Sequence, residues 1–377
     1  MIEKRERRQS LDEMLVIDAD VHLHEKPAEM AAYIDEPWKQ SLEIIGSFQD
    51  ERYLALPGFA PGDSFYFPIY RGGGDGGRAV WDVPQMRDEL DKINVDIGIL
   101  FPDHLLKLAV HPRADYAAAL ARAYNAWMVD RWCTREKGLL GCIIACNQDP
   151  LDAAREIEKY AKEPTVVGVY LPTAGVNPLW GSRKYDPIFQ AAQDADLPVL
   201  LHSVTVVHPV FPAQLHEFQT ELGQHTVSHM FAMMANMTSM IETGVCERFP
   251  DLRVAFTEAG VSWVPAMAHR LDKEYMELRR YVPILKKRPS HYLKQWYFAT
   301  QPLAEPENPQ DIVDMVRLYD GFSTTMFASD WPHHDFDHPR YVYKLPWPSE
   351  AIRRKVMGEN ALEFFRMDRD GYRLNLK

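Results

Sequence analysis

The sequence contains few cysteines, and they do not form the motifs that would give them a role. Four occur in 377 residues, and no two are spaced as Cys-x-x-Cys: Cys133, Cys142, Cys146 and Cys246. A disulfide framework needs paired cysteines in a small chain, and a thiolate zinc site needs closely spaced pairs. Neither kind of site is indicated, and the four side chains are expected to be buried free thiols.

Long apolar runs and an excess of basic charge are also missing. No stretch of about 18 apolar residues occurs, and residues 1–14 are charged with no apolar segment behind them. This pattern predicts neither a membrane span nor a signal peptide. The 42 basic and 54 acidic side chains give a net charge of −12, the opposite of the basic stripe that a nucleic-acid binder requires. We expect a cytoplasmic protein that binds neither membranes nor nucleic acid.

What the sequence does contain is an alternation of strand-like and helix-like segments. Eight short apolar runs are typical of buried strands, beginning near residues 15, 95, 139, 166, 197, 252, 297 and 325. Helical patterns lie between them, as in an α/β fold with a parallel sheet, and eight such units close a (β/α)8 TIM barrel. A doubly wound open sheet is the alternative, but His22 and His24 stand where its glycine-rich turn is expected.

The alternation is interrupted after the first predicted strand. Residues 26–90 form an irregular insertion that contains an aromatic segment, 65–70, and a glycine-rich segment, 71–78. Such a composition is typical of a flexible loop or an active-site lid. We therefore predict one distorted barrel domain over residues 1–377, with 26–90 as a lid-like insertion after strand 1.

Acidic and histidine side chains follow the predicted strands, which is where a barrel enzyme carries its active site. They are Asp18, Asp20, His22 and His24 after the first strand, His202 after the fifth, Glu258 after the sixth and Asp330 after the eighth. Nitrogen and carboxylate ligands that converge on one mouth suit Zn²⁺, Mn²⁺ or Fe²⁺. Because side chains alternate along a strand, Asp18, Asp20 and His22 are expected on one face. His24 joins them only if the extended backbone continues beyond the strand.

Each of these residues also has a simpler interpretation. His202 alone would be a core histidine, Glu258 an acid at a helix N-terminus, and Asp330 the cap of a turn. Their shared position after predicted strands favours a common site over separate coincidences.

Several motifs, taken in order, resemble the amidohydrolase superfamily. They are VIDADVHLHE (16–25), LLHS (200–203), RFPDLRVAFTEAGVSWVPAMAHRLD (248–272), FASDWPHHD (327–335) and GENA (358–361). The resemblance is strongest to an amidohydrolase-related branch that includes aminocarboxymuconate-semialdehyde decarboxylase and the resorcylate decarboxylases. It covers most of the chain but not residues 26–90.

The resemblance implies a metal site with four protein ligands. The family's first-strand His-x-His motif matches Asp20-Val21-His22, its fifth-strand histidine matches His202, and its eighth-strand aspartate, both ligand and acid/base, matches Asp330. Binuclear members bridge two metals with a lysine after strand 4, and the matching residues 170–173 contain none. One divalent ion is therefore expected, with Zn²⁺ preferred and Mn²⁺ or Fe²⁺ as alternatives.

The sixth-strand position, commonly a histidine in the family, is Glu258 in this sequence. A carboxyl group can donate a hydrogen bond there only if burial keeps it protonated. Its role stays open between ligand, acid/base and orienting group, and with Asp330 and His202 it makes up the predicted catalytic set.

The ligand set serves a decarboxylase and a hydrolase equally well, and the resemblance implies a carboxy-lyase that removes CO₂ non-oxidatively from an aromatic or unsaturated carboxylic acid, with Asp330 protonating the carbon. Two alternatives stay open: a hydrolase that cleaves an amide, ester, lactone or C–C bond, and a non-catalytic barrel that binds a ligand. The predicted substrate contacts are His229, Arg71, Trp331, His208 and His24. The resemblance and the aromatic content also suggest a homodimer.

Overall fold

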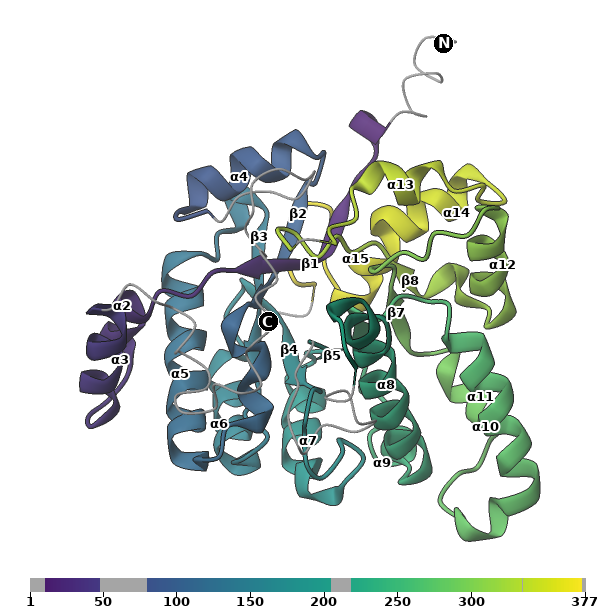
Figure 1. The fold of residues 1–377 in the computed structure, drawn as a ribbon, viewed down its shortest axis with the longest axis horizontal. Helices are drawn as coiled ribbons and strands as arrows, with labels where there is room; N and C mark the ends of the chain where they lie inside the picture. Colours follow the sequence, from purple (N-terminus) through teal and green to yellow (C-terminus); the bar gives the residue numbers. More distant parts are fainter. Residues whose placement is uncertain (1–10, 48–79, 205–217, 334, 375–377) are drawn as a thin grey trace.

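The computed structural model describes residues 11–47, 80–204, 218–333 and 335–374. Eight strands within them pair in chain order, each parallel to the next. The strands are β1 (Ile17–Leu23), β2 (Ile97–Pro102), β3 (Leu139–Ile144), β4 (Val166–Pro172), β5 (Val199–His202), β6 (Val254–Thr257), β7 (Tyr297–Ala299) and β8 (Thr325–Met326). They run through the centre of the molecule, and the helices surround them (Figure 1).

The segment after β8 returns to β1 and brings the two edges of the sheet together. The Ala19 N–H donates to the Phe327 carbonyl oxygen at 3.0 Å, and the His22 N–H donates to that of Trp331 at 2.8 Å. Val21 and Trp331 form a parallel bridge. The predicted (β/α)8 barrel is confirmed, and the open doubly wound sheet is wrong.

The strands lie in the hydrophobic core, and for this reason their positions could be predicted from apolar runs in the sequence. Every residue of β1, β2, β3 and β4 is buried. A parallel strand covered on both faces becomes a continuous apolar run. The covering helices include α5 (Ala114–Arg131), α6 (Pro150–Tyr160), α7 (Asp186–Asp194), α8 (Glu221–Glu242), α9 (Val245–Arg248), α10 (Val264–Leu278), α11 (Pro289–Leu293) and α12 (Gln310–Leu318).

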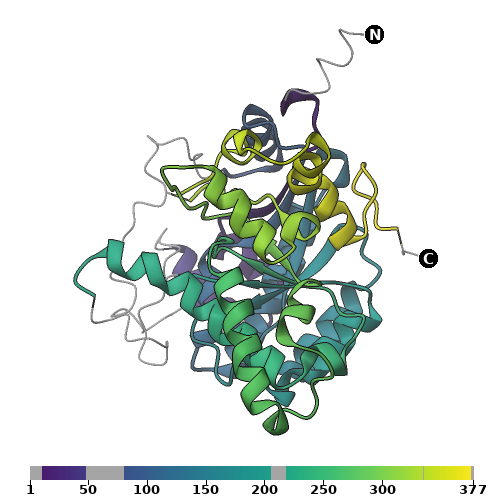
Figure 2. The ribbon, with the colours of Figure 1, turned by 90° about the vertical axis from the view of Figure 1, so that its right-hand side faces the viewer.

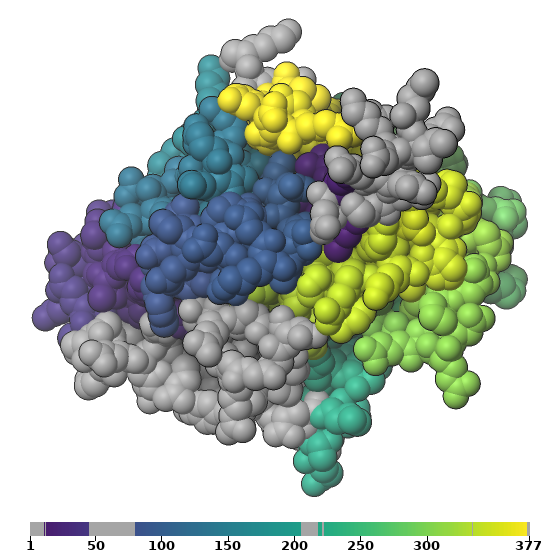
Figure 3. All heavy atoms as spheres, turned by 90° about the horizontal axis from the view of Figure 1, so that it is seen from above, coloured from purple at the N-terminus to yellow at the C-terminus, as the bar shows by residue number. Residues whose placement is uncertain are grey.

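The ends of the predicted insertion 26–90 are helical, which differs from the irregular chain expected there. They form α2 (Pro27–Met30), α3 (Trp38–Ser47) and α4 (Val83–Lys92), and the Asp82 carboxylate caps α4 by accepting the Gln85 N–H at 2.9 Å. Seen from above, α4 lies in blue between the purple N-terminal and the yellow C-terminal helices (Figure 3). The glycine-rich segment lies outside the described residues, so the lid-like role and the single-domain assignment stay predictions.

The C-terminal region packs a π-helical turn and its last helix against β8. It contains α13 (Pro339–Lys344), α14 (Glu350–Arg354), a π-helical turn (Lys355–Glu359) and α15 (Asn360–Phe365). The Asn360 side-chain amide donates to the Thr325 carbonyl oxygen at 2.7 Å, which ties this region to β8. On another side of the molecule, the N-terminal half of α8 stands out from the body (Figure 2).

Two expectations about what the chain lacks can be compared with the described residues. None of their helices is long and apolar enough to cross a membrane. All four cysteines are free, with Cys142 and Cys146 buried and Cys133 and Cys246 partly buried.

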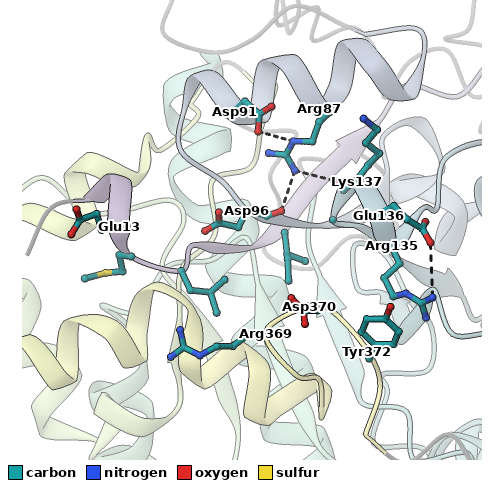
Figure 4. Close-up of a pocket in the computed structure, with 14 residues that line it drawn as sticks. Glu13, Arg87, Asp91, Asp96, Arg135, Glu136, Lys137, Arg369, Asp370 and Tyr372 are labelled. Carbon is teal, nitrogen blue, oxygen red and sulfur yellow. Dashed lines mark hydrogen bonds and ion pairs between the residues drawn. The ribbon is translucent and has the colours of Figure 1, made fainter. Parts of the chain in front are cut away.

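A polar pocket of about 710 Å³ lies where β2 and β3 begin, at the N-terminal end of the barrel. Its charged residues are Glu13, Arg87, Asp91, Asp96, Arg135, Glu136, Lys137, Arg369 and Asp370. Figure 4 shows the Arg87 guanidinium linked to Asp91 and to the backbone beside it. None of the predicted site residues that the structure describes lines this pocket.

Candidate metal centre and active site

Four of the predicted residues meet at the C-terminal end of the barrel. Asp20 and His22 lie in β1, His202 is the last residue of β5, and Asp330 follows β8. His202 Nε2 lies 2.9 Å from Asp20 Oδ1, and His22 Nε2 lies 3.2 Å from that oxygen and 2.9 Å from Asp330 Oδ1. All four side chains are fully buried.

The two imidazoles are oriented as metal ligands require. His22 Nδ1 lies 2.6 Å from the Pro102 carbonyl oxygen, and His202 Nδ1 lies 2.7 Å from that of Ser203. Because a carbonyl oxygen can only accept a hydrogen bond, each Nδ1 carries the proton, and each Nε2 in a neutral ring has its lone pair directed at the carboxylates. Lone pairs and anionic oxygens that face one another need a cation between them.

The spacing and hydrogen bonding of the four residues fit one divalent ion. Metal–ligand bonds of about 2.0–2.2 Å at ordinary coordination angles put neighbouring ligand atoms about 3.0–3.5 Å apart, close to the separations found here. Among the described residues, buried Asp20 Oδ2 has no hydrogen-bonding partner, and buried His22 Nε2 makes no hydrogen bond of good geometry with the two carboxylate oxygens near it. In the metal-free chain a proton takes the ion's place: burial opposes it, but the facing Asp20 raises the pKa of His22 to about 9.

Asp330 is held in an unusual backbone conformation at this centre. Its φ angle of 62° lies in the left-handed region, which non-glycine residues adopt only when their surroundings hold them there. The neighbouring Ser329 N–H donates to Asp18 Oδ1 at 2.8 Å, and the Ser329 hydroxyl donates to Asp18 Oδ2. Asp18 therefore secures the loop after β8, and burial raises the pKa of its carboxyl to about 8.

The Asp330 carboxylate has two further partners. His333 Nδ1 lies 2.6 Å from Oδ1, and the Gln301 amide donates to Oδ2 at 3.2 Å. Burial alone would raise the pKa of Asp330, but His333 and His22 hold it well below its ordinary value. A proton is therefore held on the nitrogen side of the Asp330–His333 pair.

Glu258 lies behind His202, on the side away from the other ligand atoms. Its Oε2 is 3.0 Å from His202 Nδ1, and its Oε1 is 3.9 Å from Nδ1 of His229 on α8. Its φ angle of 57° is also left-handed. Burial raises the pKa of Glu258 to about 7, although His202 opposes this. This placement favours an orienting or acid/base role over a ligand role.

The family model described as "Amidohydrolase" matches residues 17–367, nearly the whole chain. The chain belongs to the amidohydrolase family. Among curated relatives, gamma-resorcylate decarboxylase of Rhodococcus jostii (strain RHA1) is 25% identical over 307 residues, which are 76% of this chain and 89% of the relative. Gamma-resorcylate decarboxylase of Rhizobium radiobacter is 22% identical over 84% of this chain and 97% of its own.

Solved structures share the fold of this amidohydrolase at lower identity. The 5-carboxyvanillate decarboxylase of Sphingomonas paucimobilis superposes with a TM-score of 0.70 at 19% identity, over 94% of this chain and 100% of the other. The dihydroxybenzoic acid decarboxylase of Polaromonas sp. JS666, solved with bound manganese and 2-nitroresorcinol, has a TM-score of 0.68 at 17% identity, over 94% and 97%.

The predicted substrate contacts of the amidohydrolase are placed unequally. His229 lies beside Glu258, and burial holds its pKa well below the ordinary value, so the ring is neutral. Trp331 is 1% exposed and packs in the hydrophobic core, while its carbonyl oxygen positions His22. His24 lies apart from the four ligand atoms, beside Asp103. Arg71 and His208 lie outside the described residues, and all five contacts stay predictions.

Two residues that hold Asp330 were missed or ranked low from the sequence. Gln301 lies two residues beyond the end of β7, where the strand-end rule could have found it. His333 lies three residues after Asp330, within the motif 327–335, and this spacing is the signal that could have found it.

Proposed function

We propose that this protein is a mononuclear metal-dependent decarboxylase that removes CO₂ non-oxidatively from an aromatic carboxylic acid. The observation that carries the proposal is the buried convergence of Asp20, His22, His202 and Asp330 at the barrel mouth. The curated relatives are gamma-resorcylate decarboxylases, and the named structural neighbours also decarboxylate hydroxylated aromatic acids.

Those four residues would hold the metal. When bound, a divalent cation supplies a Lewis acid that attracts the substrate's carboxylate and an adjacent oxygen. Two imidazoles and two carboxylates accept Zn²⁺ or Mn²⁺, and we propose Zn²⁺ as the resident ion. The manganese bound in the Polaromonas decarboxylase supports Mn²⁺ as the second candidate.

The side chains of the site supply the proton that decarboxylation needs. The ring carbon that bears the carboxylate accepts a proton, the C–C bond then breaks, its electron pair restores the aromatic ring, and CO₂ leaves. Asp330 is the proposed donor, because His333 Nδ1 lies 2.6 Å from Asp330 Oδ1 and can pass it a proton. Glu258 Oε2 lies 3.0 Å from His202 Nδ1, whose proton is given to the Ser203 carbonyl oxygen, and the proposed role of the carboxylate is to stabilise that N–H electrostatically and so orient the ring.

A panel of substrates tests the reaction. The metal content of the purified protein is measured first, and the protein is then assayed with hydroxybenzoates and with matched amides, esters and lactones. We expect metal-dependent release of CO₂ and the corresponding phenol from at least one hydroxybenzoate. Hydrolysis of an ester or amide without CO₂ release would instead identify a hydrolase, and a metal-loaded protein inactive on the whole panel would support a ligand-binding barrel.

We also propose that the protein acts as a homodimer in the cytoplasm. Large apolar side chains at and near the start of α8 support an interface, since Leu222 is 78% exposed and Phe218 39%. Light scattering coupled to gel filtration tests the dimer, and a monomeric mass across the micromolar range contradicts it.

A further inference from the structure

A second group of metal-binding side chains lies beside the proposed centre. Parallel pairing of β1 with β2 sets Leu23 opposite Pro102. The next residue after each strand is therefore brought to the same edge, and these residues are His24 and Asp103. His104 follows directly, as the first residue of the 3₁₀ helix His104–Val110. Strand register thus assembles two histidines and one aspartate from separate parts of the chain.

These three side chains, here called the outer cluster, have the spacing of a metal site. His24 Nδ1 lies 3.4 Å from Asp103 Oδ2, and the His24 and His104 rings are 5.1 Å apart between centroids. One ligand atom from each residue lies within 4.8 Å of the others. The His24 and Asp103 side chains are only 9% and 7% exposed. His104 Nε2 is buried and has no hydrogen-bonding partner among the described residues.

The backbone that carries the outer cluster is fixed before any ion binds. Glu25 follows His24 in the chain and is fully buried. Its carboxylate accepts the backbone N–H of Asp103 at 3.2 Å and those of His104 and Leu105 at 3.0 Å each. One acid therefore joins the segment after β1 to the segment after β2 and sets the positions of all three proposed ligands. Such support of ligands by neighbouring groups is typical of metal sites.

We propose that His24, Asp103 and His104 bind a second divalent cation, separate from the one held by Asp20, His22, His202 and Asp330. Two imidazoles and one carboxylate suit an ion of the zinc, cobalt or manganese class and leave positions open for water or substrate oxygen. The outer cluster shares no ligand with the proposed catalytic centre.

His333 contacts a residue of each site. Its Nε2 lies 3.4 Å from Asp103 Oδ1, and its Nδ1 lies 2.6 Å from Asp330 Oδ1. A cation on the other oxygen of Asp103 would fix this carboxylate and with it the orientation of His333. The second ion is therefore a positioning element for the Asp330–His333 pair rather than a second reaction centre.

Metal stoichiometry tests this proposal. Dialysed holoprotein is analysed by elemental mass spectrometry, and the metal-free protein is titrated with Co²⁺ while visible absorption is followed. We expect two equivalents in the wild type and one in the double variant His24→Ala/His104→Ala, with the second dissociation constant raised at least about 100-fold. His269→Ala, which removes an exposed histidine outside both clusters, should keep two equivalents.

The reciprocal variant separates the two sites. Asp20→Ala/His202→Ala should retain one equivalent, with the Co²⁺ spectrum of the outer cluster. One equivalent in the wild type, or two in His24→Ala/His104→Ala, overturns the proposal. If that double variant does not fold, His104→Gln is titrated in its place, because a count of bound ions in the wild type does not show which residues hold them. Because the readout is bound metal, the result is independent of whether the substrate panel reveals a decarboxylase.

Discussion

The two ends of the barrel both gather charged side chains, but they neutralise them in different ways. At the N-terminal pocket, Arg87 Nε donates to Asp91 at 2.8 Å, and its Nη1 donates to the carbonyl oxygens of Asp96 and Lys137. Arg135 stacks on the Tyr372 ring at 3.8 Å. Two bases of this pocket, Arg87 and Arg135, therefore pair with its acids Asp91 and Glu136, so part of the charge at this end is neutralised within the protein.

At the C-terminal mouth, Asp20 and Asp330 face the imidazoles of His22 and His202. The Nδ1 atoms of these two rings already form hydrogen bonds with backbone carbonyl oxygens. Asp20 and Asp330 are fully buried, whereas the Asp91 side chain at the other end is 65% exposed. Buried charges without a counter-ion are costly, and an arginine is not among the described partners of these two carboxylates. The comparison indicates that the mouth is built for a cation and the opposite end for stability.

The largest expected effect is the loss of turnover in Asp330→Asn. The amide cannot deliver the proton and is a poorer metal ligand, so kcat should fall by about 10³-fold or more. The matched change at the other end, Asp96→Asn, should leave kcat within about twofold. Circular dichroism and steady-state CO₂ release measure both. Wild-type rates in Asp330→Asn would show that this carboxylate is not the acid.

Metal removal should come next in size. An ion that binds only the folded state at about 1,000 times its Kd stabilises that state by about 4 kcal/mol. Chelation should therefore lower the melting temperature by several degrees, and added Zn²⁺ should restore it. Arg87→Ala, at the opposite end, should show the same response to chelator. An unchanged melting temperature would mean that protons on the histidines, and not a metal ion, balance the charge of Asp20 and Asp330.

The same contrast explains how much the sequence could predict. Parallel strands buried on both faces become apolar runs, so even the three-residue β7 (Tyr297–Ala299) was found. The rule that acids and histidines follow the strands then selected Asp20, His202 and Asp330. The register between two strands cannot be derived from the sequence of either strand alone. The contact between His24 and Asp103, which depends on the register of β1 with β2, therefore could not be predicted.

The start of α4 has a local sequence signal, but the composition of the neighbouring segment pointed to a different structure. The cap Asp82 and the following Pro84 mark the start of α4, yet the nearby glycine-rich segment favoured an irregular chain. The left-handed conformations of Asp330 and Glu258 have no sequence signal, because acidic residues adopt them only where neighbouring hydrogen bonds hold them.

A backbone test at the N-terminal end should affect stability and not catalysis. Gly138 has a φ of 64°, and a Cβ there would lie 2.2 Å from the Asp96 carbonyl oxygen. Gly371 has a φ of 77°, but its Cβ would make only ordinary van der Waals contacts, the nearest with Leu140 Cδ1 at 3.4 Å. Gly371→Ala should cost about 1–2 kcal/mol for conformation alone, and Gly138→Ala at least about 1 kcal/mol more for the clash.

Denaturant unfolding measures both free energies, and CO₂ release should stay within about twofold of the wild type in each variant. Equal losses of stability in the two variants would mean that the backbone near Asp96 moves aside easily. A fall in kcat would mean that the two ends of the barrel are coupled and that the N-terminal end does not serve stability alone.

The smallest effect is expected for the exposed ion pair itself. Asp91→Asn removes one charge from a pair on the surface of α4, where such pairs contribute about 0.5 kcal/mol or less. Arg87→Ala should cost more, about 1–3 kcal/mol, because it strips donors from the carbonyl oxygens of Val95, Asp96 and Lys137. Denaturant unfolding at low and high salt compares the two variants. If Asp91→Asn were as destabilising as Arg87→Ala, and salt removed the difference from wild type, charge pairing and not backbone satisfaction would stabilise this end.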